Sequence, residues 1–388
     1  MMKKQYTPRE MIEILVSFDT TSRVSNLELI AFVSNYLALH GIESHLIHNE
    51  DHSKANLYAT LGPAKSGGIV LSGHTDVVPV DGQDWTVNPF RPVQKDNRIY
   101  GRGTTDMKSF LAIALALVPE FLRRGLHIPV HFALSYDEEV GCLGAPQLVE
   151  HIVAHVPRPK MVIIGEPTDM KVVSAHKGIH ALRTRVTGRE AHSSATHKGV
   201  NAVMVAAKLI GFISELADEC KAQADLASPF DPPHTTLQVG TITGGTALNI
   251  IAKSCVFEWE IRALPTENPN DILQRFENFV RTQILPKIKQ VSHEVSIETK
   301  TLAHVPAFLS RADSAIESLM LLIARQNETG VAAYGTEAGI FQSADMPTFV
   351  CGPGNIAQAH RPDEYIELAQ VDSCVDFMHR LMDQVCDS

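Results

Sequence analysis

A helix is predicted near the start of the chain, where apolar residues recur at helical spacing from Met11 to Phe18. Thr7 precedes Pro8, and Glu10 follows Thr7 by three residues, which is the pattern of a capping box. Because a capping box satisfies backbone donors that the start of a helix leaves unpaired, we expect this helix to begin directly after Thr7.

Further along, short runs of β-branched and aromatic residues alternate with stretches of helical periodicity. Each run is bounded by turn residues, as is typical of strands. The four clearest runs span residues 68–72, 130–135, 161–164 and 348–351. Strands that alternate with helices predict an α/β domain, in which helices cover a mixed sheet.

The segment from about 179 to 298 follows a different pattern. Two helical stretches, 201–220 and 270–288, are interleaved with strand-like runs in the order β-α-β-β-α-β. This order fits a small ferredoxin-like α+β domain inserted into the α/β domain. We therefore expect two domains, one formed by 1–178 and 299–388 and the other by 179–298.

Charge and hydropathy narrow the classes of function. The 388 residues include 44 acidic and 34 basic side chains, a net charge of −10, and contain no Lys/Arg run that could track phosphates. Nucleic acid is therefore not expected as a partner. The longest apolar stretch, 110–118, is far shorter than the roughly 20 residues that cross a bilayer, so a membrane is not expected either.

The first residues and the cysteines indicate the compartment. Residues 1–11 are polar and lack the apolar core of a signal peptide. The six cysteines are scattered without a CxxC pair, which argues for reduced thiols and excludes a structural zinc finger. We expect a soluble, cytosolic protein.

Five motifs carry histidine or carboxylate side chains, and four of them follow a predicted strand. In an α/β sheet, ligands bind beyond the carboxyl ends of the strands. The residues are His74 in SGHTDVVP, Asp106 in GRGTTDMK, Glu138 and Glu139 in SYDEEVG, Glu166 in IIGEPT, and His360 in GPGNIAQAHRPDE. Their repeated occurrence at strand ends predicts one ligand site.

The residue types in these motifs indicate a pair of metal ions. Two histidines and three carboxylates, without cysteine, suit Zn²⁺, with Co²⁺ and Mn²⁺ as alternatives. Five ligands are too many for one four-coordinate catalytic zinc that keeps a position open for water. They are the right number for two ions that share a carboxylate at a separation of about 3.5–4 Å.

Two further carboxylates have expected supporting roles. Asp76 lies two residues after His74, on the same side of an extended segment, so it can accept a proton from the second ring nitrogen of His74. Glu138 and Glu139 are adjacent and should point apart. One can then bind metal while the other acts as a general base toward water.

The motifs SGHTDVVP, GRGTTDMK, DEEVG, GEPT and AHRPDE together resemble the family of co-catalytic metallopeptidases and deacylases over nearly the whole chain. This family includes acetylornithine deacetylases, succinyl-diaminopimelate desuccinylases, aminoacylases and carboxypeptidase G. The resemblance implies hydrolysis of an N-acyl amino acid by a homodimer, with the inserted domain as lid and dimer interface.

The same resemblance implies a role for each motif residue. His74 and Glu166 would complete one ion site, His360 and Glu139 the other, and Asp106 would bridge the two ions. Glu138 would be the general base. A cis peptide is implied directly after the bridging carboxylate, at Asp106–Met107.

Further substrate contacts are implied by the resemblance. His192 would reach across the dimer to stabilise the oxyanion, and Asn249 and Arg262 would bind substrate, with Arg262 suited to a carboxylate. Backbone amides at Gly352 and Gly354 would approach the ligand. Alternatives stay open, because Arg262 could instead form an ion pair with Glu258 or Glu260, and the glycines could serve turns.

Four segments favour the acetylornithine branch of that family. They span 175–181, 192–202, 334–341 and 352–365. A desuccinylase, a broader aminoacylase or a dipeptidase would keep the same chemistry with another substrate. A non-catalytic metal-binding scaffold on the same fold is the alternative from a different class.

Overall fold

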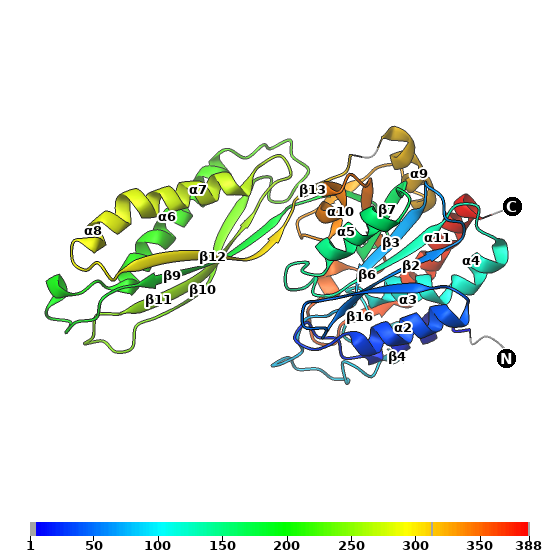
Figure 1. Cartoon of the computed structure of the whole chain (residues 1–388), viewed down its shortest axis with the longest axis horizontal. Helices are drawn as coiled ribbons and strands as arrows, with labels where there is room; N and C mark the ends of the chain where they lie inside the picture. The colour runs from blue at the N-terminus through cyan, green and yellow to red at the C-terminus, as the bar shows by residue number, and fades with distance from the viewer. Residues whose placement is uncertain (1–4, 312, 387–388) are drawn as a thin grey trace. The chain divides into compact units, whose positions relative to one another are not determined.

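The computed structural model describes residues 5–311 and 313–386 of the chain. They form two compact units. The larger unit comprises Met1–Ala175, Leu309–Val331 and Thr336–Ser388, and the inserted unit comprises His176–Phe308 and Ala332–Gly335. Both are labelled in Figure 1 by their helices and strands.

The larger unit is built on a nine-stranded mixed sheet with the order β1-β2-β6-β3-β7-β15-β8-β13, in which β14 pairs with β8. Its strands are β1 (Ser44–His48), β2 (Ala55–Leu61), β3 (Ile69–His74), β6 (Val130–Ser135), β7 (Met161–Pro167), β8 (Val173–His176), β13 (Phe308–Leu309), β14 (Gly330–Ala332) and β15 (Thr348–Gly352). The middle strands β6, β3, β7 and β15 are mutually parallel. These four are the runs expected from the sequence, so the predicted α/β fold with a mixed sheet is confirmed.

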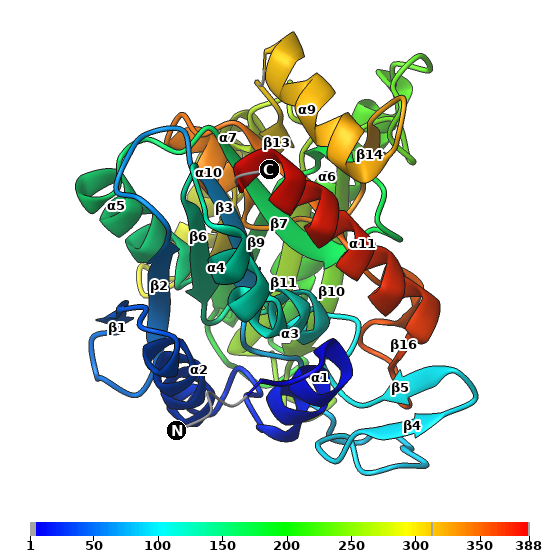
Figure 2. The same cartoon turned by 90° about the vertical axis from the view of Figure 1, so that its right-hand side faces the viewer.

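Helices cover both faces of this sheet (Figures 1 and 2). The helices of the unit are α1 (Pro8–Ser17), α2 (Leu27–Leu39), α3 (Lys108–Ala116), α4 (Val118–Arg124), α5 (Ala145–His155), α9 (Ser314–Ala324), α10 (Ala338–Ser343), the 3₁₀ turn η3 (Ile356–Gln358) and α11 (Leu368–Val385). On one face α3 packs on β3 and against α1 and α11, whereas α5 packs with α10 and against β2 and β6. The strands between them are fully buried, which explains why their sequences are mostly apolar.

The start of α1 follows from its sequence. The Thr7 hydroxyl accepts a hydrogen bond from the Glu10 backbone N–H, and the Glu10 carboxylate accepts one from the Thr7 backbone N–H. This reciprocal pair is the capping box predicted from the sequence.

The larger unit also contains a separate three-stranded sheet, with the order β16 (Tyr365–Glu367), β5 (Arg98–Tyr100) and β4 (Val93–Lys95). Strand β16 leads directly into the first residue of α11 and contacts that helix.

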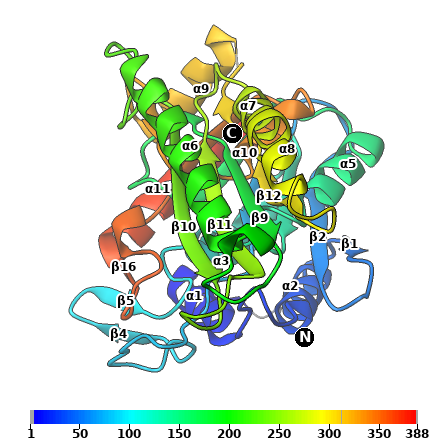
Figure 3. The same ribbon diagram turned by 90° about the vertical axis from the view of Figure 1, so that its left-hand side faces the viewer.

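The inserted unit has the expected β-α-β-β-α-β order. Its elements are β9 (Ile179–Thr187), the 3₁₀ turn η1 (Thr196–Lys198), α6 (Ala202–Ala222), β10 (Thr236–Gly244), β11 (Ser254–Arg262), α7 (Pro269–Phe279), the π-helical turn η2 (Val280–Ile284), α8 (Leu285–Lys289) and β12 (Ser296–Val305). The antiparallel sheet runs β10-β11-β9-β12, and α6 and α7 lie together against it (Figure 3). This is the strand order of a ferredoxin-like domain.

The boundary of the inserted unit differs from the expected position at 298/299. That position falls within β12, which pairs with β9 from Ser296 to Val305. Because β12 pairs with β9 on both sides of one register shift, between Thr301 and Ala303, the whole strand belongs to the inserted unit, which continues to Phe308.

Two findings concern membrane-spanning helices and disulfides. Within residues 5–311 and 313–386, no helix is both long and apolar enough to cross a membrane. All six cysteines lie in the described part of the chain, and none of them forms a disulfide there.

Candidate metal centre

His74 is the last residue of β3 and is almost completely buried, with 1% of its side chain exposed. Its Nε2 donates to Asp106 Oδ1 at 3.1 Å and lies 3.6 Å from Glu166 Oε1. Although burial disfavours a charged imidazole, its hydrogen bonds to Asp106 and Asp76 raise the pKa of His74 well above its usual value. The ring is therefore held among three carboxylates.

Asp106 lies between two histidines. Its Oδ1 faces His74, and its Oδ2 lies 3.2 Å from His360 Nε2. Burial opposes its ionisation, but the hydrogen bonds from His360 and His74 outweigh burial and hold the pKa of Asp106 well below its usual range. The Asp106–Met107 peptide is cis, as the resemblance implies. One carboxylate thus directs one oxygen at each histidine.

His360 completes a second cluster beyond β15. Its Nε2 also lies 3.1 Å from Glu139 Oε2, and the hydrogen bonds to Asp106 and Glu139 raise the pKa of His360 to about 10. Unlike His74, its side chain is 52% exposed. The residue has a positive φ of 64°, an uncommon conformation for a side chain of this size.

Glu138, Glu139 and Glu166 are acidic groups in a buried and already acidic environment. Burial raises the pKa of all three, and for Glu138 and Glu166 the pKa lies well above its usual value. Neighbouring carboxylates add to this shift, Glu139 in the case of Glu138 and Asp106 in the case of Glu166. Such a cluster favours protons or bound cations.

Asp76 holds the loop that carries Glu138 and Glu139. Its carboxylate accepts hydrogen bonds from the backbone N–H of Glu138 at 3.0 Å and of Glu139 at 3.2 Å, and from the Ser22 hydroxyl at 2.7 Å. The oxygen closest to His74 Nδ1 is the main-chain oxygen of Asp76, at 2.9 Å, whereas the carboxylate Oδ1 lies at 3.6 Å. The main chain and the carboxylate of Asp76 thus both face His74 Nδ1, and the carboxylate also holds the backbone of the two glutamates.

The loop that carries Asp106 is held by a second buried carboxylate, Glu364. Its Oε1 accepts from the backbone N–H groups of Gly103, Thr105 and Asp106 at 2.9–3.2 Å. Its Oε2 pairs with Arg102 Nη1 at 2.6 Å, and both side chains are almost fully buried. Arg102 and Glu364 lie inside the motifs quoted from the sequence, but no local pattern assigned them a role.

Glu337 is another buried carboxylate that the sequence did not single out. Burial raises the pKa of Glu337 to about 7, although a hydrogen bond with Ser135 and the nearby His74 oppose this shift. Its charge is close enough to that of Glu138 to raise the pKa of Glu138. A residue of this kind adds to the excess of acidic groups that a bound cation would relieve.

In the inserted unit, the structure brings together His192 and Asn249. The Ser193 N–H donates to the Asn249 carbonyl oxygen at 3.0 Å, and a β-bridge joins His192 to Ile250. Both predicted side chains are exposed, and His192 Nδ1 lies 2.8 Å from the Ser194 hydroxyl. The two residues therefore form one exposed surface of polar groups within this unit.

Three other predicted substrate contacts have different partners. Arg262 Nε pairs with Glu260 Oε2 at 3.1 Å, which is one of the alternatives left open by the sequence. The Gly352 N–H donates to Thr168 Oγ1 and the Gly354 N–H to Gln370 Oε1, so both amides are already engaged. A side chain at Gly352 would clash with the Gly165 carbonyl oxygen, so close strand packing accounts for this glycine.

The donor set fits divalent metal ions. Ligand atoms of His74, Asp106 and Glu139 lie within 4.8 Å of one another, as do those of His74, Glu138 and Glu166. Glu139 Oε1 is buried and has no hydrogen-bond partner in the described part of the chain, which is costly without a cation. Imidazole nitrogens and carboxylate oxygens, without thiolate, suit Zn²⁺, Co²⁺ or Mn²⁺.

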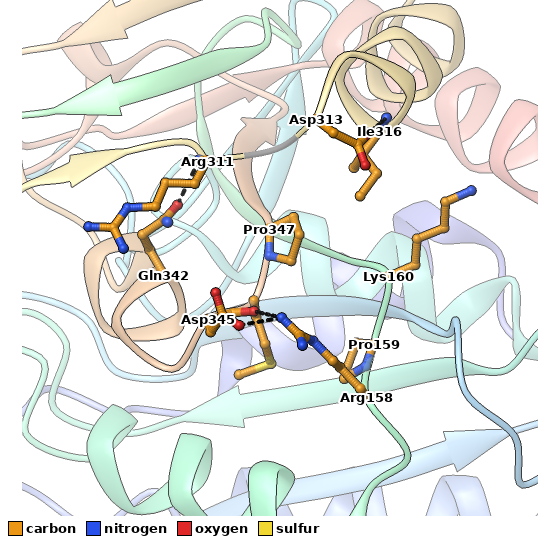
Figure 4. A pocket seen from close by; sticks show the side chains of 10 residues that line it. Arg158, Pro159, Lys160, Arg311, Asp313, Ile316, Gln342, Asp345 and Pro347 are labelled. Atoms are coloured by element: carbon orange, nitrogen blue, oxygen red, sulfur yellow. Dashed lines mark hydrogen bonds and ion pairs between the residues drawn. The ribbon is translucent and has the colours of Figure 1, made fainter.

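A cavity of about 340 Å³ elsewhere on the larger unit does not gather several ligand groups around one point as the metal centre does. Figure 4 shows that Arg158 is engaged by Asp345, while Lys160 and Arg311 extend away from each other. The cations at this cavity therefore do not form one charged site.

The fold and the buried cluster of histidines and carboxylates define a metal-dependent hydrolase. A model of peptidase family M20/M25/M40 matches residues 70–384. Acetylornithine deacetylase of Pasteurella multocida (strain Pm70) is 33% identical, covering 99% of this chain and 100% of that protein. A metallo-carboxypeptidase of the M20 family from Sulfolobus solfataricus shares the fold, with a TM-score of 0.75 at 15% identity, over 97% of this chain and 99% of the other.

The chain belongs to peptidase family M20/M25/M40. It is a hydrolase that acts on amides and depends on divalent metal. A second relative, acetylornithine deacetylase of Salmonella paratyphi B (strain ATCC BAA-1250 / SPB7), is 34% identical over 86% of this chain and 84% of that protein.

Proposed function

We propose that this protein hydrolyses N2-acetyl-L-ornithine to L-ornithine and acetate with two divalent ions. The observation that carries the proposal is the Asp106 carboxylate, which directs one oxygen at His74 and the other at His360. A carboxylate shared in this way suits a pair of ions. The names of the relatives support the substrate.

Each histidine belongs to one ion site in this proposal. His74 and Glu166 would hold one ion, and His360 and Glu139 the other, with Asp106 shared between them. Ions bound there would polarise the amide carbonyl and lower the pKa of a water molecule toward about 7. The protein's own residues supply position and proton transfer.

Glu138 is the proposed general base. Asp76 fixes its backbone N–H, and its carboxylate lies among the acidic side chains of the cluster, close to His74. Glu138 would accept a proton from the attacking water and then deliver it to the amine nitrogen as the carbon–nitrogen bond breaks. Acetate and the free amine are the products, so protons balance over the cycle.

The inserted unit would serve as lid and dimer interface and would contribute polar groups to the substrate. His192 is exposed and its ring can donate a hydrogen bond, which suits stabilisation of the oxyanion that forms during attack. Asn249 lies beside it and would hydrogen-bond the substrate. Arg262 would bind the α-carboxylate only by exchanging its bond to Glu260.

The homodimer is supported by exposed apolar residues at one edge of the inserted unit. The strand β10 is at the end of the sheet, and Ile242 on it is half exposed. Leu248 and Ile250, in the loop that follows, and Met204, at the start of α6, are also exposed. An open strand edge beside apolar side chains favours pairing with a second copy of the chain.

We expect Leu248→Asp to convert a two-chain particle into single chains, because a charge would be buried at the interface. Light scattering coupled to size exclusion measures the mass directly. Leu226→Asp is the matched control, since Leu226 is also exposed but lies beyond the opposite end of α6. A wild-type protein that runs as single chains would contradict the dimer.

The finer assignments of metal, compartment and pathway are also proposals. Zinc is favoured by the nitrogen and oxygen ligands, and metal analysis of the purified protein tests it. A cytoplasmic location is supported by six cysteines that form no disulfide in the described part of the chain, and fractionation of cells tests it. A place in arginine biosynthesis follows from the proposed product, ornithine, and rescue of an arginine auxotroph tests it.

The substrate is tested by parallel hydrolysis of N-acetylornithine and succinyl-diaminopimelate by the metal-loaded protein. We expect release of acetate from the first substrate, with kcat/KM at least about tenfold higher than for the second. A preference for succinyl-diaminopimelate or for a dipeptide would keep the metal chemistry and assign another substrate. Absence of turnover over a panel of N-acyl amino acids and dipeptides would favour a non-catalytic metal-binding protein.

A further inference from the structure

The two histidines of the metal centre are held in different ways. His74 ends a buried strand, and its second ring nitrogen bonds the Asp76 main chain at 2.9 Å. His360 lies on a half-exposed loop with positive φ, and no described residue bonds its Nδ1. Metal-bound histidines usually have such a second partner. The position of the His360 ring therefore depends on how its backbone is held.

A loop from Gln83 to Thr86 holds that backbone at both ends of one turn. Gln83 Nε2 donates to the His360 carbonyl oxygen at 2.9 Å. Three residues further on, the Asp363 carboxylate accepts from the Thr86 backbone N–H at 2.8 Å and from the Thr86 hydroxyl at 2.9 Å. Asp363 also has a positive φ, of 52°. The loop thus secures the turn at its two unusual backbone positions.

Arg102 joins this loop to the bridging carboxylate. Its Nη2 donates to Gln83 Oε1 at 2.6 Å, and its Nη1 pairs with Glu364, which binds the backbone N–H of Asp106. The Trp85 indole N–H also donates to Gln83 Oε1, at 3.0 Å. Gln83 therefore has its oxygen fixed by two donors, and its amide nitrogen is directed at His360.

We propose that Gln83 and Thr86 form a positioning element, the His360 clamp, that sets the affinity of the ion bound through His360 and not that of the ion bound through His74. Arg102 holds Gln83 in place but also supports Asp106, which both ions would share. The inference rests on the proposed two-ion function. The His74 side needs no clamp because strand β3 and the Asp76 main chain already fix that ring. Loss of a supporting bond of this kind typically weakens metal binding about 10–100-fold.

Calorimetric titration of metal-free protein with Zn²⁺ tests the proposal. We expect two ions per chain in the wild type. In Gln83→Met, which keeps the length of the side chain but removes both polar ends, the dissociation constant of one ion should rise at least about tenfold while that of the other is unchanged. Gln94→Met is the matched control, because Gln94 is exposed on β4.

A second variant separates the bond to His360 from the bond to Arg102. Gln83→Glu keeps an acceptor for Arg102 and Trp85 but cannot donate to the His360 carbonyl oxygen. We expect it to weaken the same ion as Gln83→Met. Titration with Co²⁺ gives an absorption spectrum for each ion, so in the variant one component should need at least about tenfold more Co²⁺ to saturate while the other is unchanged.

The outcomes distinguish the inference from the function on which it rests. Two ions with unchanged affinities in both Gln83 variants would overturn the clamp, as would an equal loss of both ions. A wild type that binds fewer than two ions would overturn the two-ion function itself. Thermal unfolding of the metal-free proteins shows whether Gln83→Met folds, and if it does not, Gln83→Glu decides between the same outcomes.

Discussion

Glu138→Gln should lower kcat by about 10²–10⁴-fold, because an amide of the same size cannot accept a proton from water. Asp76 binds the backbone of residue 138, not its side chain, so the loop should keep its conformation. We expect KM to change little. Steady-state kinetics with N-acetylornithine measures both parameters.

The control for this variant is Glu150→Gln on α5, which is exposed and distant in sequence from every motif of the centre. Metal content of the two proteins should be equal to that of the wild type. If Glu138→Gln kept full turnover with its metal intact, another group would have to be the base. The buried Glu337, which has a pKa raised to about 7, would then be the next residue to replace.

Removal of metal with a chelator should abolish hydrolysis, and added Zn²⁺ should restore it. The physical reason is that negatively charged carboxylates cannot polarise an amide carbonyl, whereas a metal cation bound among them can. We expect restored activity to rise with the amount of Zn²⁺ and to level off near two ions per chain. Activity after each addition gives this curve directly.

Metal removal should also lower the thermal unfolding temperature. The chain gathers Asp106, Glu138, Glu139 and Glu166 in one buried cluster, and bound cations compensate that excess of negative charge. A ligand that binds only the folded state adds about 2.7 kcal/mol of stability at a free concentration of 100 times its dissociation constant. Mg²⁺ at the same concentration is the control, since it keeps its own waters and binds such sites weakly. Full activity after exhaustive chelation would contradict the metal mechanism.

The strands and the residue types of the centre could be predicted because their signals are local. A buried parallel strand is read from a short apolar run, and the four expected runs became β6, β3, β7 and β15. Parallel strands share one carboxyl edge, so the motifs that follow them had to approach one another. The start of α1 was predictable for the same reason, since its capping box spans only Thr7 to Glu10.

The hydrogen-bond and ion-pair partners of several predicted substrate-binding residues could be assigned only from the folded structure. The sequence left open whether Gly352 and Gly354 serve the substrate or the backbone, and in the structure their amides donate to Thr168 and Gln370. The ion pair of Arg262 with Glu260 was one of several open alternatives until the side chains were placed. Such outcomes depend on which polar groups the fold brings within hydrogen-bond distance of a donor, and a sequence pattern does not contain that information.

By itself, the sequence determined the sheet, the inserted β-α-β-β-α-β unit and the kinds of side chain at the strand ends, because periodicity and turn chemistry act over a few residues. Only the tertiary structure decided which oxygen of Asp106 faces which histidine, and that Gln83 holds His360 from 277 residues away. Contacts over such distances form when packing closes the loops between them. Their geometry is therefore a property of the whole fold.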